Sequence, residues 1–227
     1  RKISAVPVIF LTSKCDDVDE TSGLDSGADD FAMDPEHARA LVSGRTRVIM
    51  PVDPFGQPAD HLSLERLAAE SGSRLVVDAA CSLGASRGGR ECGAHGDMGC
   101  FSFHPRKVVT CGEGGMVTTD DSSLASRLRL LRNHGSQKIG ERTLEFVEPG
   151  FNYRLSEIPA ALGLAQMGRL DQILFDRRTT AGRYDEALAL VPGVEVLETV
   201  PGTIQSYQSY VVVLDDSVDR DIVIAEM

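Results

Sequence analysis

The amino-acid sequence predicts an α/β fold organised around a mostly parallel β-sheet, followed by the beginning of a smaller α+β domain. Short apolar runs alternate with amphipathic stretches in the first half of the chain, which is typical of strand–helix–strand units. The runs are continuously apolar, as expected for strands that helices cover on both faces. From residue 191 onward, short strands and a helix start follow one another without that alternation.

Seven apolar or β-branched runs predict the strands. Each is short, and several are bounded by glycine, proline or aspartate. The predicted strands cover residues 6–12, 47–52, 74–80, 98–103, 115–119, 194–197 and 207–214.

Helical spacing of apolar residues predicts two helices in the first part of the chain. Residues 61–71 (HLSLERLAAES) place leucine and alanine at helical intervals, and Gly72 fits the C-terminal stop. Residues 121–134 repeat leucine with the same period, and Gly135 ends that helix.

The second half of the chain predicts longer helices. Residues 155–190 form one or two helices that begin at Ser156, with Pro159 in the first turn, where proline is tolerated. A last helix begins in 219–227.

Composition places the chain among soluble globular proteins and excludes several partners. The 227 residues carry a formal net charge of −11, and 42% of them are apolar. Such a chain is long enough for one or two domains. The excess of acidic residues argues against nucleic acid and anionic membranes as partners. No apolar run approaches the roughly 18 residues of a membrane span.

The cysteines and the start of the chain favour a cytoplasmic location. No signal peptide is recognisable after Arg1, and the number of cysteines, five, is odd. Without an oxidising compartment we expect reduced thiols. The cysteines stand at positions 15, 81, 92, 100 and 111.

Asp78 stands at the end of a predicted buried strand. Ligands of open α/β sheets bind outside the carboxyl ends of the strands. A carboxylate there is costly to bury unless it meets a cation or hydrogen-bond donors. A binding role therefore competes with a plainer one, in which Asp78 caps a helix or closes a turn.

The segment FSFHPRKVVTCGEGG, residues 101–115, combines polar groups with a glycine-rich loop. Lys107 lies between the strand that contains Ser102 and this loop. A lysine held close to a ligand and partly desolvated suits Schiff-base chemistry, and the Ser102 hydroxyl can donate to a phosphate. The alternative is a surface lysine beside a hairpin turn, because GEGG alone is a weak signal.

Cys92, His95, Cys100 and His104 have the residue types of a zinc site, in the spacing C-x2-H followed by C-x3-H. Alternation along the predicted strand puts Cys100 and His104 on one face. Structural zinc sites usually have tighter turns between their ligands. We therefore expect buried thiols here and assign no metal site.

A pyridoxal 5'-phosphate site would account for three of these residues together. The cofactor needs a lysine for its aldehyde, a carboxylate for its protonated pyridine nitrogen, and hydroxyl or backbone donors for its phosphate. Lys107, Asp78 and Ser102 supply these groups from neighbouring strand ends.

Residues from about 29 to 227 resemble the sugar aminotransferases of the DegT/DnrJ/StrS type. The matching text is VDAACSLGA (77–85), GDMGCFSFHPRKVVTCGEGGMVTTDD (96–121), LRLLRNHG (128–135) and GFNYRLSEIPAALGLAQMGRLD (150–171), with RTRVIMPVDPFGQPAD (45–60) upstream. The resemblance implies a pyridoxal-phosphate-dependent transferase of fold type I. It also implies a homodimer with a shared active site, which transfers an amino group from glutamate to a nucleotide-linked keto sugar.

The resemblance also implies roles for single residues. Lys107 would bind the cofactor and act as the base for the proton shift, and Asp78 would pair with the pyridinium nitrogen. Ser102 would bind the phosphate, and Asn152 would reach the phosphate of the neighbouring subunit. A plainer alternative makes Asn152 a turn residue before a helix cap. Cys81 stands where many members carry glutamine or histidine against the ring hydroxyl, and a thiol is a weaker donor.

The same resemblance divides the chain. Residues 29–190 correspond to a portion of the large domain, and residues 191–227 to the start of a truncated small domain. The phosphate loop and the aromatic residue over the ring, which the family places upstream, do not occur before Arg45. We therefore expect a central fragment of such an enzyme, with exposed sheet edges and poor solubility.

The N-terminal segment resembles a different family. Residues 6–33 (VPVIFLTSKCDDVDETSGLDSGADDFAM) look like the fourth strand, fourth helix and fifth strand of a response-regulator receiver domain. Thr12 would match the switch hydroxyl, and Asp34 stands where a lysine is typical. We expect residues 1–28 to be this receiver-like segment or another foreign N-terminus, with the junction near residue 28.

The function that these observations favour is pyridoxal-phosphate-dependent transamination of a nucleotide-linked keto sugar. Such a reaction serves the synthesis of amino sugars for cell-surface polysaccharides or secondary metabolites. Two alternatives stay open at this point. One is a catalytically inactive aminotransferase fragment, and the other is a receiver-type signalling fusion.

Overall fold

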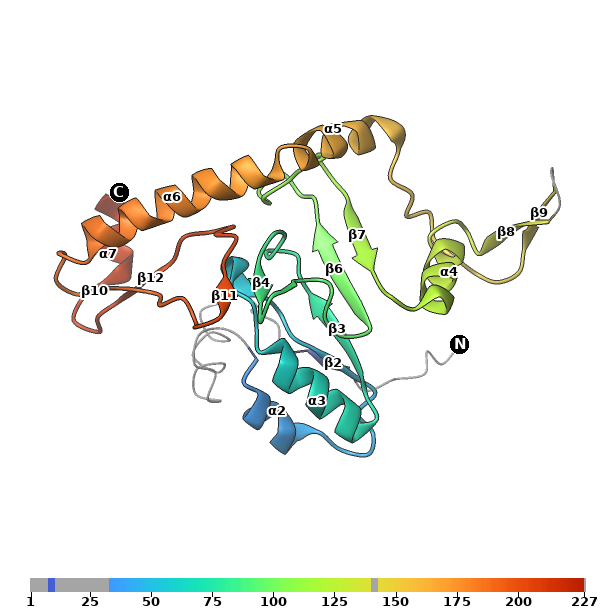
Figure 1. The fold of residues 1–227 in the computed structure, drawn as a ribbon, viewed down its shortest axis with the longest axis horizontal. Helices are drawn as coiled ribbons and strands as arrows, with labels where there is room; N and C mark the ends of the chain where they lie inside the picture. Colours follow the sequence, from blue (N-terminus) through green and yellow to red (C-terminus); the bar gives the residue numbers. More distant parts are fainter. Residues whose placement is uncertain (1–7, 11–32, 140–142, 227) are drawn as a thin grey trace.

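The computed structural model describes residues 8–10, 33–139 and 143–226. Its central sheet has five strands in the order β1-β2-β3-β6-β7 (Figure 1). Four of them run parallel: β1 (Val8–Phe10), β2 (Val48–Met50), β3 (Arg74–Asp78) and β6 (Met98–Ser102). The edge strand β7 (Gly115–Thr118) is antiparallel to β6. The mostly parallel sheet that the sequence predicts is therefore confirmed.

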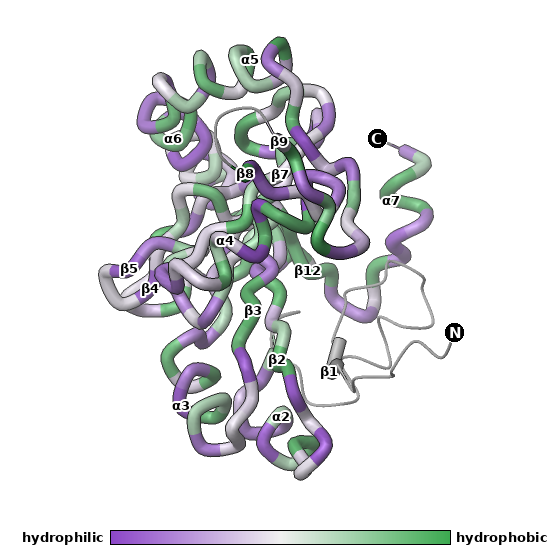
Figure 2. The backbone as a smooth tube through the Cα atoms, turned by 90° about the vertical axis from the view of Figure 1, so that its right-hand side faces the viewer, coloured by the Kyte–Doolittle hydropathy of each residue, from purple (hydrophilic) through white to green (hydrophobic). Residues whose placement is uncertain are grey.

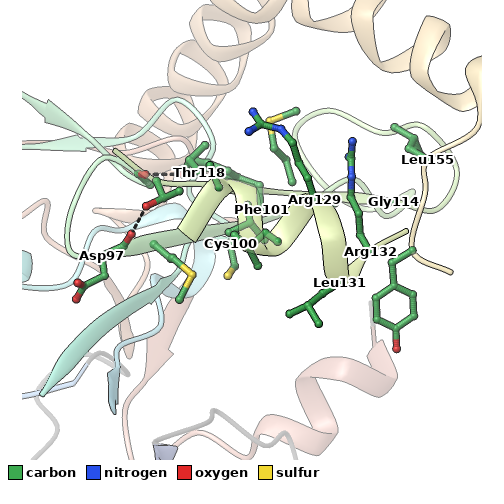
Figure 3. A pocket seen from close by; sticks show the side chains of 18 of the residues that line it. Asp97, Cys100, Phe101, Gly114, Thr118, Arg129, Leu131, Arg132 and Leu155 are labelled. Carbon is green, nitrogen blue, oxygen red and sulfur yellow. Dashed lines mark hydrogen bonds between the residues drawn. The ribbon is translucent and has the colours of Figure 1, made fainter. Parts of the chain in front are cut away.

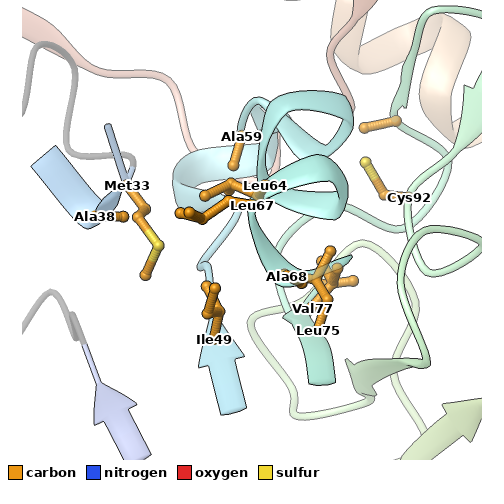
Figure 4. Close-up of a cluster of buried hydrophobic side chains, with 12 residues drawn as sticks. Met33, Ala38, Ile49, Ala59, Leu64, Leu67, Ala68, Leu75, Val77 and Cys92 are labelled. Carbon is orange, nitrogen blue, oxygen red and sulfur yellow. The ribbon is translucent and has the colours of Figure 1, made fainter. Parts of the chain in front are cut away.

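Helices α2 (Pro35–Leu41) and α3 (His61–Ser71) pack on one face of this sheet. Helix α3 has the predicted bounds because both ends carry local signals. Asp60 caps its N-terminus, and Gly72 ends it with a φ of 66°. The buried face of α3 meets β2 and β3 in the main hydrophobic core (Figure 4). That core contains Ile49, Leu64, Leu67, Leu75 and Val77.

The opposite face of the sheet is less covered. Alternation along β3 and the pairing of β3 with β6 place Val76, Asp78, Cys100 and Ser102 on that face. All four are half-buried. The apolar strands β2 and β3 run side by side through the middle of the molecule (Figure 2).

The segment after the sheet forms longer helices and a hairpin. Helix α4 (Ser122–Leu131) leads into a hairpin of β8 (Ser136–Ile139) and β9 (Thr143–Phe146), which projects from the body (Figure 1). The predicted helical region 155–190 divides into α5 (Glu157–Met167) and α6 (Leu170–Leu188). Helix α6 packs through Leu174 on a second apolar cluster, formed by Phe103, Val108, Val109 and Cys111.

The C-terminal part contains short elements. Strand β10 (Val194–Val196) pairs antiparallel with β12 (Val212–Leu214), and α7 (Arg220–Glu226) follows. Strand β11 (Thr203–Ile204) pairs with β4 (Ser86–Arg87), which pairs in turn with β5 (Arg90–Glu91). A short 3-10 turn, η2 (Pro54–Gly56), follows β2.

The prediction of a strand over 207–214 is too long at its start. Tyr207 has a φ of 48°, which a β-strand does not allow. The preceding residues instead bind another part of the chain, since Ser206 N–H donates to the Gly56 carbonyl at 3.1 Å. The predictions for residues 1–28, apart from the strand at 8–10, lie outside the described residues.

Candidate active site

Two parallel strands bring the predicted cofactor residues to one edge of the sheet. Asp78 of β3 lies opposite Cys100 of β6 in the strand register, and Ser102 follows two residues further along β6. The turn after β3 contains Cys81, and the loop after β6 contains Lys107. The side chains of these four predicted residues therefore converge from two neighbouring strand ends.

Asp78 closes a turn and could also bind a ligand. One carboxylate oxygen, Oδ1, accepts the Ala80 N–H at 3.0 Å, which closes the turn after β3. The side chain is half-buried on the less covered face of the sheet. Burial, and then the negative charge of Asp78, raise the pKa of the Cys100 thiol. The carboxylate thus faces a partly desolvated space in which a cationic partner would be favourable.

Lys107 lies directly over the turn that follows Asp78. Its Nζ donates to Cys81 Sγ at 3.0 Å, which joins the two loops. The lysine loop is fixed on both sides of Lys107. On one side, the Lys107 N–H donates to the His104 carbonyl at 2.9 Å. On the other, Val108 and Val109 are buried in the second apolar cluster.

Helix α5 fixes the same loop by a pair of hydrogen bonds. The Thr110 N–H donates to Gln166 Oε1 at 3.1 Å, and Gln166 Nε2 donates to the Thr110 carbonyl at 2.6 Å. This reciprocal amide contact holds the backbone three residues beyond Lys107. The lysine is therefore positioned by rigid elements rather than by a free surface loop.

Ser102 ends β6 beside the glycine-rich loop. Its hydroxyl accepts the His104 N–H at 3.4 Å, so the hydroxyl proton is free to donate to a ligand. Gly115 faces Ser102 across the β6–β7 pair. A Cβ at Gly115 would lie 2.7 Å from the Phe101 carbonyl oxygen, so this close pairing requires glycine.

Asn152 is not part of this group of residues. It is exposed, and its backbone forms a bridge with Asn133 beyond the end of α4. Arg154 NH1 donates to Asn133 Oδ1 at 2.7 Å, which fixes the same stretch. The predicted role of Asn152 concerns a neighbouring subunit and stays a prediction.

Residues more than 90 positions away in the chain support the turn around Cys81 and the loop that contains Lys107. Ser206 is fully buried and donates its hydroxyl to the Cys81 carbonyl at 3.0 Å. Arg178 NH2 donates to the Gly84 carbonyl at 2.9 Å, and Gln208 Nε2 donates to the Arg106 carbonyl at 2.9 Å. Sequence reasoning missed all three, because no local pattern marks a serine, arginine or glutamine for such long-range contacts.

The four residues with zinc-ligand types do not form one site. In the part of the chain that the structure describes, the group of acidic, histidine and cysteine side chains close enough to hold an ion is Asp53, His61 and Cys92. Cys100 instead lies beside Asp78, and the half-buried His104 has its Nε2 4.0 Å from Glu113 Oε1.

A large open groove lies beside β7, apart from the lysine. Its volume is about 1360 Å³, and its lining comes from β6, β7, α4 and the segment before α5. Figure 3 shows Arg129 and Leu131 of α4 and Arg132, which follows that helix, with Cys100 and Phe101 of β6 and Leu155 from that segment. Among the described residues, Asp78, Ser102 and Lys107 do not line this groove.

Comparisons with known proteins agree on one family. Residues 20–227 match the DegT/DnrJ/EryC1/StrS aminotransferase family. The chain is 40% identical over 166 residues to a GDP-perosamine synthase from Caulobacter vibrioides. The matched region covers 73% of this chain and 44% of that protein. The chain thus spans less than half the length of this curated relative.

Solved structures share the fold. The structure of DesI in the presence of its TDP-sugar product superposes with a TM-score of 0.78 and 35% identity, over 86% of this chain and 50% of that chain. Spr1654 from Streptococcus pneumoniae, in its PLP-form, superposes with a TM-score of 0.79 and 26% identity, over 88% of this chain and 56% of that chain. The fold is therefore that of the sugar aminotransferases, as predicted.

Proposed function

Because this chain belongs to the DegT/DnrJ/EryC1/StrS aminotransferase family, we propose that it acts in the transamination of a nucleotide-linked keto sugar with pyridoxal 5'-phosphate as cofactor. The observation that carries the proposal is the convergence of Asp78, Ser102 and Lys107 at the carboxyl edge of β3 and β6. A carboxylate, a hydroxyl and an amine are the groups that this cofactor requires.

The residues at this edge fit the cofactor chemically. When bound, the pyridinium ring withdraws electrons from the substrate carbon that loses its proton. The Asp78 carboxylate would accept a hydrogen bond from the ring nitrogen and keep that nitrogen protonated. The Lys107 amine would hold the cofactor and carry the proton between substrate atoms, while the Ser102 hydroxyl would donate to the phosphate.

The turn and the loops contribute by positioning. The Cys81 thiol lies 3.0 Å from the lysine nitrogen and would contact the cofactor's ring hydroxyl. The Gln166 amide and the buried Val108 and Val109 restrict the lysine loop. A restricted amine loses little conformational entropy when it reacts, which favours catalysis.

The names of two relatives support the proposed substrate class. One relative is named a GDP-perosamine synthase, and another was solved with a TDP-sugar product. A nucleotide-linked keto sugar as acceptor is therefore part of the proposal, and glutamate is the amino donor that we add to it from the resemblance described above. The same proposal includes a cytoplasmic location, supported by unpaired cysteines at 81, 92, 100 and 111. None of the described helices has the length and hydropathy to cross a bilayer.

We further propose that the active unit is a homodimer with a shared site. Helix α5 supports this, because several of its large apolar side chains are exposed, Ile158 by 85% and Leu164 by 75%. Exposed apolar surface of this extent is typical of an interface. Asn152, exposed just before α5, is available to reach the phosphate of the neighbouring subunit.

The test is cofactor binding at a defined lysine. Purified protein is mixed with pyridoxal 5'-phosphate, the visible spectrum is recorded, and borohydride reduction followed by peptide mapping locates the label. We expect an absorbance band and a label on Lys107, both abolished in Lys107→Ala. Lys138→Ala is the matched control, because Lys138 is exposed on the projecting hairpin and should change neither readout.

Two outcomes contradict the proposal. A band of unchanged size in Lys107→Ala would show that another group binds the cofactor. A wild-type protein without any band would support the alternative of a catalytically inactive chain. Assays with nucleotide-linked keto sugars and glutamate then test the substrate class on a protein with a confirmed cofactor site.

A further inference from the structure

A buried polar cluster lies on the α3 side of the sheet edge, apart from Lys107. Asp53 follows β2, His61 is the first residue of α3, and Cys92 follows β5. Asp53 and His61 are fully buried and Cys92 is 4% exposed. One ligand atom from each of the three residues lies within 4.8 Å of the others. The mechanism proposed above uses none of them.

The carboxylate is the centre of this cluster. Asp53 Oδ1 accepts the Ala59 N–H at 2.9 Å and lies 2.7 Å from His61 Nε2. Its other oxygen, Oδ2, accepts the Ser82 hydroxyl at 2.7 Å. Buried carboxylates and imidazoles persist only when they are paired or bind a cation. Both Asp53 oxygens are paired, whereas His61 Nδ1 is buried without a hydrogen-bond partner in the described part of the chain.

A second histidine lies beside the cluster without hydrogen bonds. His95 is 1% exposed, and its ring centroid is 4.5 Å from that of His61. Neither of its ring nitrogens makes a hydrogen bond in the described part of the chain, although Nδ1 lies 3.4 Å from Glu65 Oε1. Its Nε2 is thus a buried polar atom without a partner among the described residues, which is rare and costly. An additional ligand at this place would relieve that cost.

We propose that Asp53, His61 and Cys92 bind a divalent metal ion of the zinc class, with His95 as the fourth donor. A site that combines oxygen, nitrogen and sulfur donors suits zinc, whereas magnesium and calcium prefer oxygen ligands alone. Tetrahedral zinc keeps its ligand atoms about 3.3–3.8 Å apart. Asp53, His61 and Cys92 therefore need to move by about an ångström around an ion, and His95, which lies outside their 4.8 Å group, has to move further.

Metal binding releases one proton from the protein. The Cys92 thiol is buried and carries its proton at neutral pH when no ion is bound, as an ordinary thiol does. An incoming divalent ion forms the metal–sulfur bond and releases that proton to solvent. The proton on His61 Nε2 moves to Nδ1 of the same ring, which the described residues leave without a partner, so that Nε2 and the Asp53 carboxylate bind the ion without further proton loss. The 2.7 Å contact between Asp53 and His61 is then replaced by one metal bond to each of the two residues.

This inference differs from the sequence interpretation, which assigned no metal. It also uses a different ligand set from the C-x2-H and C-x3-H spacing. Only the fold brings Cys92 to the other two residues, because Asp53 and His61 lie at the two ends of the β2–α3 connection and Cys92 lies in the connection between β5 and β6. The inference is independent of the proposed aminotransferase activity, since it concerns residues that would not touch the cofactor.

The experiment measures metal content and coordination. The full chain is stripped with a chelator, loaded with Zn²⁺ and dialysed, and its zinc content is determined by mass spectrometry. A second sample is loaded with Co²⁺, because a cobalt–thiolate bond gives a charge-transfer band in the near ultraviolet. We expect about one ion per chain and a near-ultraviolet band that reports the cobalt–sulfur bond.

Variants identify the ligands. Cys92→Ser should abolish the cobalt–sulfur band and lower zinc affinity at least tenfold. Cys111→Ser is the matched control, because Cys111 is also 4% exposed but belongs to the second apolar cluster. It should leave both readouts unchanged. His95→Gln should weaken binding while the cobalt–sulfur band persists.

Two results would overturn the proposal. The first is wild-type protein that retains no zinc and shows no cobalt–sulfur band, which would make the cluster a purely hydrogen-bonded one. The second is a band that Cys111→Ser removes and Cys92→Ser does not. Because the wild-type measurement needs no substitution, a variant that fails to fold leaves the first result decisive.

Discussion

At the scale of single residues, Glu65 of α3 joins three groups around the loop before β6. Its Oε1 accepts the Gly96 N–H at 2.9 Å, and both carboxylate oxygens lie 3.1 Å from Arg90 NH1. Burial would raise the pKa of Glu65, but the Gly96 hydrogen bond and the charges of Arg90 and His95 outweigh it, so the pKa is lowered. The folded state therefore favours the ionised carboxylate.

This lowered pKa predicts how stability depends on pH. The contribution of ionised Glu65 is complete above its unfolded pKa of 4.5 and is lost as the pH falls through the lower folded value. Glu65→Gln should cost about 1 kcal/mol at pH 7. The difference from wild type should shrink as the pH falls below 4.5 in urea denaturation series. Glu186→Gln, at an exposed position on α6, is the control and should follow wild type at every pH.

A constant difference between wild type and Glu65→Gln at all pH values would contradict this account. It would mean that the substitution acts through packing rather than through charge. The control separates the effect of Glu65 from the general titration of an acidic chain.

Single residues also show what the sequence can predict about a site. The grouping of Asp78, Ser102 and Lys107 was predictable, because parallel strands end at one edge and each residue follows or ends such a strand. The cluster around Asp53 was not. Its contact with Ser82 spans 29 residues and depends on how the turn after β3 folds back, which no local pattern encodes.

At the scale of elements, the start of α3 depends on Asp60. Its Oδ1 accepts the Ser63 N–H at 3.2 Å, and its Oδ2 accepts the Ser63 hydroxyl at 3.0 Å. Asp60→Ala should therefore destabilise the protein by about 1 kcal/mol, the usual cost of losing an N-cap. Urea denaturation followed by circular dichroism measures the change.

The conservative variant Asp60→Asn tests the cause. Asparagine caps a helix about as well as aspartate, so most of the lost stability should return. If Asp60→Asn is as unstable as Asp60→Ala, then the ion pair between Asp60 and Arg87, at 3.3 Å, is responsible instead of the cap.

Elements were predictable where their signals are local. The bounds of α3 agree with the sequence because Asp60 and Gly72 act within one turn of the helix. The hairpin β8–β9 was missed, since its strands are short and largely polar. The strand predicted from residue 207 begins at Val212, because residues 206 and 209 hydrogen-bond to the turn at Phe55 and Gly56. Such long-range pairing competes with local strand preference and prevails.

At the scale of the whole molecule, exposed apolar surface predicts self-association. Helix α5 has no buried residue among its described positions, yet it is rich in apolar side chains. Ile158 and Leu162 lie one helical turn apart and are 85% and 49% exposed. Sedimentation velocity should show a dimer that forms as the protein concentration rises, in line with the proposed homodimer.

Substitutions on α5 test where the association occurs. The double variant Ile158→Lys and Leu162→Lys should shift the equilibrium to the monomer, because a buried lysine is costly. Leu41→Lys is the control, since Leu41 is an exposed leucine on α2, a different helix. A double variant that associates as strongly as wild type would place the interface elsewhere, for example at the edge strand β7.

The two hydrogen bonds between Gln166 and Thr110 give α5 a second role besides the proposed contact with a partner. The helix that offers its apolar side chains to a partner is also bonded to the loop that contains Lys107. If a second copy of the chain covers α5, docking and lysine placement become coupled through one rigid helix. Dilution would then dissociate the dimer and release the Lys107 amine from its fixed position. Turnover per chain would therefore fall as the protein concentration falls.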